Sequence, residues 1–175
     1  MLYAIGDLKP VISEDVFIAP GARIIGQVTI KSQSSVWYNA VIRGDIDAVY
    51  IGAATNVQDN CTIHEDKGYP VMIGDRVSVA HGSVLHGCTV EDDALIGMGC
   101  CVLTGAYIGE GAIIGANSLV TGKTRIPPYT LALGSPAKPV RELTEKDLEE
   151  ARLIFNIYRE RAAYYRKNMS RLNHS

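Results

Sequence analysis

Three of the four histidines in the chain, His64, His81 and His86, lie within a segment of 23 residues. Imidazole nitrogen is a common zinc ligand, and three such ligands leave one tetrahedral position open for water, as in catalytic zinc sites. Zinc lowers the pKa of such a water to about 7, so hydroxide is available near neutral pH. We therefore expect these histidines to bind Zn²⁺, although imidazole also suits Fe²⁺ and Co²⁺.

Polar residues that could serve this metal site lie in two stretches before and beside His64. Gln58 and Asp59 could hydrogen-bond to the metal ligands or to a substrate. Arg43 and Asp45 flank the site, and we expect Arg43 to form an ion pair with an aspartate across a subunit interface. Cys88, two residues after His86, is a candidate additional ligand.

A six-residue sequence repeat predicts the architecture that must position these residues. An aliphatic residue recurs at every sixth position, with three short interruptions, and the residue four positions further on is mostly small. This period fits neither a helix nor a single half-buried strand, but it fits short strands joined by tight corners, three to a coil. The chain is thus predicted to be an all-β solenoid, a parallel β-helix. The nineteen positions are Ile12, Ile18, Ile24, Ile30, Val36, Ile42, Ile51, Val57, Ile63, Ile73, Val79, Leu85, Val90, Ile96, Val102, Ile108, Ile114, Val120 and Ile126.

The repeat also predicts which residues share a face. Positions 42, 63 and 85 are three hexads apart, so the residues that follow them, Arg43, His64 and His86, should stack in one column. Neighbouring coils lie about 4.8 Å apart, the usual spacing between strands. Two imidazoles at that separation can share one metal ion.

His81 belongs to the preceding face, because it follows Val79 by two residues, and Asp59 should stack beside it. A ligand supplied by the adjacent face of another subunit would complete the site, since three prisms around a threefold axis bring unlike faces together. The alternative is a corner that lets His81 swing round within its own chain.

The chain divides into three parts. Residues 1–142 are expected to form the β-helix with the metal site, ending where prolines cluster. Residues 143–168 are expected to form a C-terminal helix, with Thr144 as its N-cap and one apolar stripe that packs on the solenoid or on a neighbouring subunit. Residues 169–175 form a polar tail.

Composition excludes several classes of protein. The net charge of −2 and the pI near 6.1 give no basic footprint of the kind that nucleic-acid-binding proteins carry. No apolar run approaches the roughly 20 residues that span a bilayer, and the N-terminus lacks the basic and apolar stretches of a signal peptide. Four cysteines without CxxC spacing point to a reducing, cytoplasmic setting.

These residues resemble those of the γ-class carbonic anhydrase family, left-handed hexapeptide-repeat trimers with zinc between subunits. The resemblance covers nearly the whole chain and rests on four stretches: residues 41–45 (VIRGD), 56–64 (NVQDNCTIH), 78–87 (SVAHGSVLHG) and 97–99 (GMG). It implies that His64 and His86 come from one subunit and His81 from its neighbour.

The same resemblance assigns roles to further residues. Arg43 and Asp59, with Asp45, look like interface ion-pair residues, Gln58 like the residue beside the metal-bound water, and Asn56 like another active-site residue. Tyr158 is similar to a helix tyrosine that some members bring towards the site. The chain departs from the family's prototype in one place: the extended acidic loop after the first histidine is reduced to eight residues, Glu65 to Met72.

The leading functional hypothesis is a zinc-dependent carbonic anhydrase that hydrates CO₂ reversibly to bicarbonate, as a cytoplasmic homotrimer. In it, Gln58 orients the water or CO₂, and Asp59 or Glu65 relays protons. A hexapeptide acyltransferase with one histidine as general base is an alternative. A metal-binding relative with little or no activity is a third, because the shortened loop removes the prototype's proton shuttle.

Overall fold

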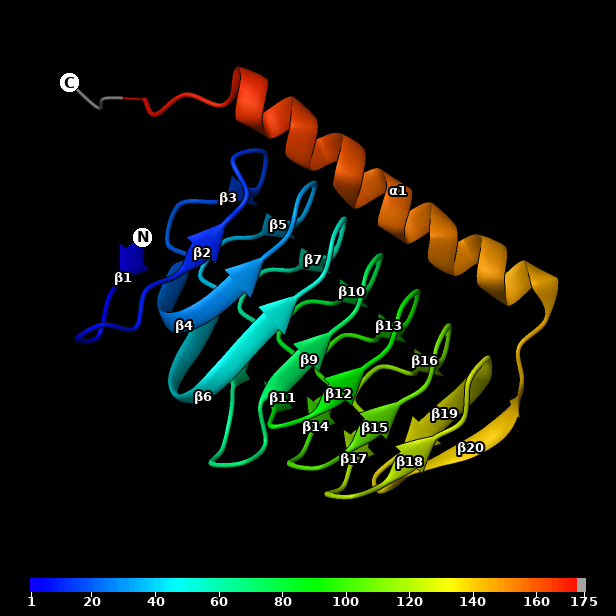
Figure 1. The fold of residues 1–175 in the computed structure, drawn as a ribbon. Coiled ribbons are helices and arrows are strands. Elements are labelled where there is room, and N and C mark those ends of the chain that lie inside the picture. Colours follow the sequence, from blue (N-terminus) through cyan, green and yellow to red (C-terminus); the bar gives the residue numbers. More distant parts are fainter. Residues whose placement is uncertain (173–175) are drawn as a thin grey trace.

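The computed structural model describes residues 1–172 and shows a left-handed parallel β-helix with one long helix on its side (Figure 1). The fold class predicted from the repeat is therefore confirmed. Of the nineteen ladder side chains, all but Ile12 and Ile18 are at most 1% exposed, and those two lie at the open N-terminal end. The aliphatic ladder thus forms the interior of the solenoid.

Three flat faces surround this interior. The face that carries His64 and His86, here the histidine face, consists of the first halves of β4 (Arg23–Ile30) and β6 (Val41–Ile51), then β8 (Thr62–His64), β11 (Val84–His86), β14 (Cys101–Val102) and β17 (Leu119–Val120). The next face along the chain, here the third face, contains β2 (Val11–Ile12), the second halves of β4 and β6, β9 (Val71–Ile73), β12 (Thr89–Val90), β15 (Tyr107–Ile108) and β18 (Arg125–Ile126).

The remaining face, here the helix face, contains β3 (Phe17–Ile18), β5 (Ser35–Val36), β7 (Asn56–Val57), β10 (Ser78–Val79), β13 (Leu95–Ile96), β16 (Ile113–Ile114) and β19 (Thr130–Gly134). One further strand is added at each end of the solenoid: β1 (Leu2–Tyr3) pairs with β4 on the histidine face, and β20 (Ala137–Glu142) returns antiparallel to β19 on the helix face. These strands pair with sheet edges that would otherwise leave backbone groups unpaired.

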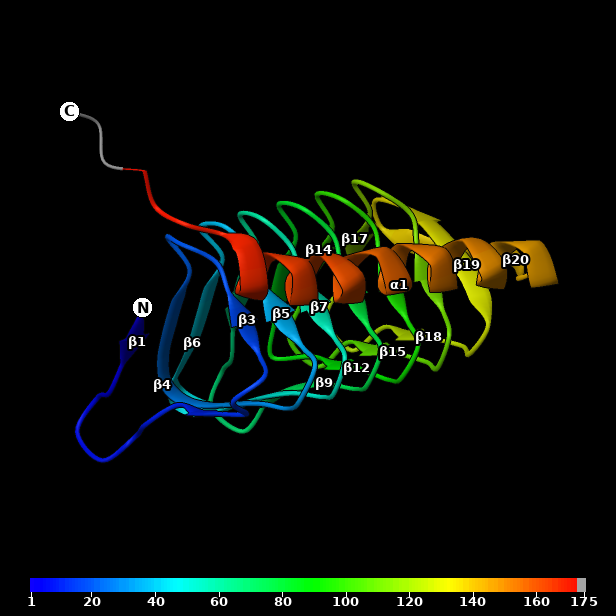
Figure 2. The same ribbon diagram turned by 90° about the horizontal axis from the view of Figure 1, so that it is seen from above.

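Helix α1 (Glu145–Asn168) runs back along the solenoid from its last coil towards its first (Figures 1 and 2). Thr144 and Asp147 form a capping box at its start. Its second half packs on the helix face, where Tyr158, Ala162 and Tyr165 contact a cluster around Phe17 and Trp37. This packing brings Tyr158 to the edge of the helix face that carries His81.

The corner after the first half of β6 is three residues longer than a regular hexad, because Ile51 follows Ile42 by nine residues. The pairing of β4 with β6 shifts between Gly26 and Val28, where the longer corner is accommodated. A Cβ atom on Gly26, whose φ is +75°, would lie 2.1 Å from the carbonyl oxygen of Gly44, so only glycine allows this close approach. The corner places Asp45 beside the histidine face.

No helix within residues 1–172 combines the length and the apolarity needed to cross a membrane. The predicted tail, residues 169–175, extends three residues beyond the described part of the chain.

Candidate functional site

His64 and His86 are direct neighbours on the histidine face. Strands β8 and β11 pair His64 with His86, and β6 and β8 pair Arg43 with His64, so the predicted column is confirmed. The two rings are partly buried, with centroids 5.1 Å apart and planes tilted by 57°. The hexad repeat therefore positions two imidazoles on adjacent coils with their ring nitrogens in reach of each other.

The nitrogens that face each other have the geometry of a ligand pair. Nδ1 of His64 lies 3.1 Å from Nε2 of His86. Two nitrogens at about 2.1 Å from a tetrahedral zinc ion would lie about 3.4 Å apart. The facing nitrogens are thus spaced almost as zinc requires.

The outer nitrogens of the two rings each have a separate partner. Nε2 of His64 lies 3.1 Å from Oδ1 of Asp45, and Nδ1 of His86 lies 2.9 Å from Oγ1 of Thr104. A carboxylate only accepts, so the partner of His64 assigns the proton to Nε2 and leaves a lone pair on Nδ1. The Thr104 hydroxyl can accept or donate, so it allows either tautomer of His86. With the proton of His86 on Nδ1, two lone pairs face each other between the rings and the donor set fits a divalent metal; with the proton on Nε2, the two rings form a hydrogen bond instead.

Asp45 is itself held by Arg43. The Arg43 guanidinium contacts both oxygens of Asp45, at 2.6 and 2.5 Å. Burial acts to raise the pKa of Asp45, but the hydrogen bonds from Arg43 and His64 outweigh it and hold this pKa below its usual value. Asp45 is therefore a stable carboxylate behind His64. The ion pair of Arg43 lies within one chain, whereas Asp59, its expected interface partner, pairs with His81.

Glu65 is buried under this corner with no exposed surface. Its Oε1 accepts the backbone N–H groups of Asp45 and Ile46 at 2.8 and 2.9 Å and lies 3.7 Å from Nε2 of His64. Its Oε2 is the one buried side-chain oxygen or nitrogen without a hydrogen-bond partner among the described residues. Asp45, His64 and Glu65 bring their ligand atoms within 4.8 Å of one another, the only such group of three in residues 1–172. This group lies at the outer nitrogen of His64, on the other side of the ring from the nitrogen that faces His86.

His81 lies apart from the other two histidines. Its Nδ1 is 2.9 Å from Oδ2 of Asp59, its Nε2 is 3.0 Å from the hydroxyl of Tyr158, and its backbone N–H donates to Oε1 of Gln58 at 3.3 Å. Among the described residues, His81 forms no hydrogen bond with His64 or His86. Its side chain is 44% exposed at the edge of the helix face. One chain thus presents a pair of imidazoles on one face and a single imidazole at another.

Asn56 and Gln58 form a buried polar row below His81, and each is 2% exposed. The Gln58 side-chain amide donates to Oδ1 of Asn56 at 3.0 Å, and the amide of Asn56 donates to Oγ of Ser78 at 2.8 Å. These bonds fix the orientation of both amides.

Tyr158 packs edge-on against Trp37, and burial, followed by the negative charge of Asp59, raises the pKa of its hydroxyl. Tyr158 is therefore protonated at neutral pH and can donate to His81.

Thr104 is the residue near the site that sequence reasoning missed. The register places Leu103, not Thr104, beside His86, because Leu85 pairs with Val102. Thr104 reaches His86 from the corner after β14, and the conformation of a corner cannot be read from the repeat. The sequence offered one hint of this contact: Thr104 carries a hydroxyl and lies one coil after His86, a candidate ligand.

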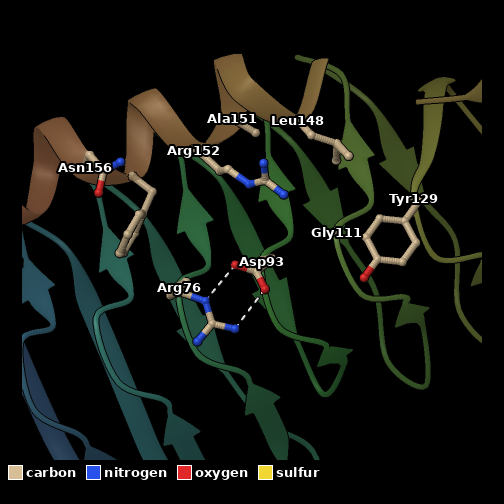
Figure 3. Close-up of a pocket in the computed structure, with 9 residues that line it drawn as sticks. Arg76, Asp93, Gly111, Tyr129, Leu148, Ala151, Arg152 and Asn156 are labelled. Carbon is tan, nitrogen blue, oxygen red and sulfur yellow. Dashed lines mark hydrogen bonds and ion pairs between the residues drawn. The ribbon is translucent and has the colours of Figure 1, made fainter. Parts of the chain in front are cut away.

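Two cavities within residues 1–172 lie away from the histidine pair. One of about 370 Å³ separates the first half of α1 from the corners beneath it. Figure 3 shows Arg152 reaching into it from the helix, above the ion pair of Arg76 with Asp93. It contains none of the predicted site residues. A second cavity, of about 360 Å³, lies beside His81, with Asp59 and Tyr158 in its wall.

The buried cysteines are expected to be unreactive. Burial raises the pKa of Cys61 to about 11 and that of Cys88 to about 12, and both side chains belong to the core. Because a raised pKa leaves little thiolate at pH 8, iodoacetamide should not modify either residue in the folded protein. Peptide mass mapping would check this, with urea-unfolded protein as the control in which both are modified. Rapid alkylation of Cys88 in the folded state would contradict its burial and reopen its assignment as a metal ligand.

Several known proteins with similar sequences are named carbonic anhydrases. Residues 87–122 match the family described as bacterial transferase hexapeptide (six repeats). The chain is 56% identical to a probable carbonic anhydrase of Methanocaldococcus jannaschii, over 79% of this chain and 87% of that one, and 47% identical to a carbonic anhydrase of Geobacillus kaustophilus, over 95% and 91%. It is 45% identical to mitochondrial gamma carbonic anhydrase 2 of Arabidopsis thaliana over 81% of its length, but it spans only 53% of that protein.

Solved structures extend this similarity to the whole fold. A crystal structure from Bacillus cereus is 48% identical and superposes with a TM-score of 0.93, covering 94% of this chain and 96% of that one. That protein is provisionally named an acetyltransferase. The similarity therefore reaches proteins that carry two different functional names.

Proposed function

Because the chain belongs to the γ-class carbonic anhydrase family of hexapeptide-repeat proteins, we propose that it hydrates CO₂ reversibly to bicarbonate at a zinc site shared between the subunits of a homotrimer. The observation that carries the proposal is the pair of facing nitrogens on His64 and His86, 3.1 Å apart, with their outer nitrogens held by Asp45 and Thr104. A metal bound there supplies water acidified to a pKa of about 7.

The third ligand in this proposal is His81 of a neighbouring subunit. Within one chain His81 lies on a different edge of the prism from His64 and His86, and its side chain is 44% exposed. A threefold arrangement brings the helix face of one subunit against the histidine face of the next. Asp59 then holds Nδ1 of His81 and leaves Nε2 as the ligating nitrogen once the Tyr158 hydroxyl moves off it.

Gln58 is proposed to orient the reactants. Its amide is fixed by Asn56 and by the backbone of His81, so its position beside the third ligand is set before substrate arrives. A preorganised amide of this kind contributes more than a mobile one, because it does not reorient during the reaction. Asn56 acts through Gln58 and not directly on substrate.

Asp59 is the better of the two proposed proton carriers. Hydration of CO₂ releases one proton in each turnover, and that proton must reach solvent. The side chain of Asp59 is 28% exposed and contacts His81, whereas that of Glu65 is fully buried. A carrier must exchange protons with bulk water, so exposure favours Asp59.

The proposal is tested by metal analysis together with stopped-flow CO₂ hydration. We expect about one zinc ion per subunit in protein purified without chelator, and hydration that is lost on removal of the metal and regained on adding zinc. Protein that binds no divalent metal would overturn the proposal. Anaerobic purification would also reveal Fe²⁺ as the native ion, because imidazole binds both metals.

Two other functions share the fold. The name of the Bacillus cereus structure supports a hexapeptide acyltransferase, which would consume acetyl-CoA without metal. A relative that binds metal with little turnover would show full zinc occupancy but no hydration.

We place the protein in the cytoplasm, a proposal supported by its four free cysteines.

A further inference from the structure

We propose that Thr104 is a positioning residue for the metal site: its hydroxyl accepts the Nδ1 proton of His86 and thereby aims Nε2 of that ring at the metal. This inference rests on the proposed metal site of the preceding section. It adds a residue that acts through His86 and not on the substrate.

The position of Thr104 is set independently of His86. The N–H of Gly105 donates to the carbonyl of Gly87 at 2.7 Å, and the N–H of Gly87 donates to the carbonyl of His64 at 3.0 Å. These bonds connect three successive corners of the histidine face. A Cβ atom on Gly87 would lie 3.2 Å from Cγ2 of Thr104, so the threonine methyl group packs over the Gly87 backbone. The backbone next to Thr104 and its methyl group are thus held by contacts other than the one with His86.

The direction of this hydrogen bond follows from the proposed metal, which needs the lone pair of Nε2 on His86. Oγ1 of Thr104 lies 2.9 Å from Nδ1 of His86. When this oxygen accepts the Nδ1 proton, Nε2 carries the lone pair and faces Nδ1 of His64. The opposite tautomer would place a proton between the two rings and block the shared ion.

Each proposed ligand then has one dedicated partner on its outer nitrogen. The carboxylate of Asp45 contacts His64, and the carboxylate of Asp59 contacts His81. The hydroxyl of Thr104 contacts His86 and is uncharged. A hydroxyl can accept the ring proton as a carboxylate does but adds no negative charge to the site.

The experiment compares Thr104→Val with Thr104→Ser in the full-length protein. Valine has nearly the shape of threonine without the acceptor, and serine retains the acceptor. Zinc affinity, measured by competition with a chromogenic chelator, should fall about 10–100-fold in Thr104→Val, the usual effect of losing such a partner, and stay within about threefold in Thr104→Ser. If Thr104→Val does not fold, as judged by circular dichroism, Thr104→Ala replaces it.

A second measurement reports the hydrogen bond directly. In zinc-loaded protein with ¹⁵N-labelled histidine, the Nδ1 proton of His86 should exchange slowly with solvent in the wild type and in Thr104→Ser, and markedly faster in Thr104→Val. A change that only loosened the fold would not distinguish serine from valine in this way.

The failure of this inference can be told apart from the failure of the proposed function. Unchanged zinc affinity and unchanged exchange of the His86 Nδ1 proton in Thr104→Val would overturn the role of Thr104 while leaving the metal site intact. Wild-type protein that binds no zinc would overturn the proposed function, on which the role of Thr104 rests.

Discussion

We expect His64→Ala and His81→Ala to regain about a quarter of wild-type zinc binding and CO₂ hydration when they are refolded together in equal amounts. Each variant by itself is expected to bind no metal. Each variant alone lacks one of three ligands at every site. In a mixed trimer, however, one interface joins an intact His64 and His86 pair to an intact His81. About three quarters of randomly assembled trimers are mixed, and each has one complete site of three.

The matched control uses two residues assigned to the same subunit. His64→Ala and His86→Ala, refolded together, should restore nothing, because no chain in the mixture carries both halves of the pair. Zinc per trimer, measured by mass spectrometry of the metal, and stopped-flow hydration would be read on both mixtures. Recovery in the control mixture, or its absence in the first mixture despite trimer formation, would refute the division of ligands between subunits.

Loss of Glu65 is expected to give the largest fall in stability of any single change near the site. Its Oε1 accepts two backbone N–H groups, from Asp45 and Ile46, in a fully buried setting. In Glu65→Ala both donors lose their acceptor and a cavity remains, at a cost of about 2–5 kcal/mol. For a chain of this size that corresponds to a Tm lower by roughly 5–15 °C. Thermal unfolding of the metal-free protein, followed by circular dichroism, measures it.

Glu65→Gln separates support of the corner from proton transfer. Glutamine keeps a carbonyl oxygen for the two N–H groups, so its Tm should lie within about 3 °C of the wild type. If Glu65 supports the corner, CO₂ hydration by this variant stays close to that of the wild type. A large loss of hydration with an unchanged Tm would instead assign Glu65 as the proton carrier, in place of Asp59.

The sequence by itself determined the solenoid and the histidine column. A six-residue period with an aliphatic side chain at every inward position has few ways to bury those side chains, and the structure buries them at all but two positions. The same period fixes which residues are neighbours on adjacent coils, because parallel strands in a solenoid pair one full turn apart. The spacing of the repeat therefore suffices to pair His64 with His86.

The tertiary structure decided what the corners and side chains do. The repeat says nothing about the path of the longer corner at Asp45, so the contacts of Arg43 and Glu65 with it were not predictable. Thr104 likewise reaches His86 from a corner and not from the strand register. Tyr158 reaches His81 only because α1 folds back over the solenoid, 77 residues later in the chain. These contacts depend on backbone turns and side-chain rotamers that become fixed when the whole coil stack packs, whereas strand register depends only on the spacing of apolar residues along the chain.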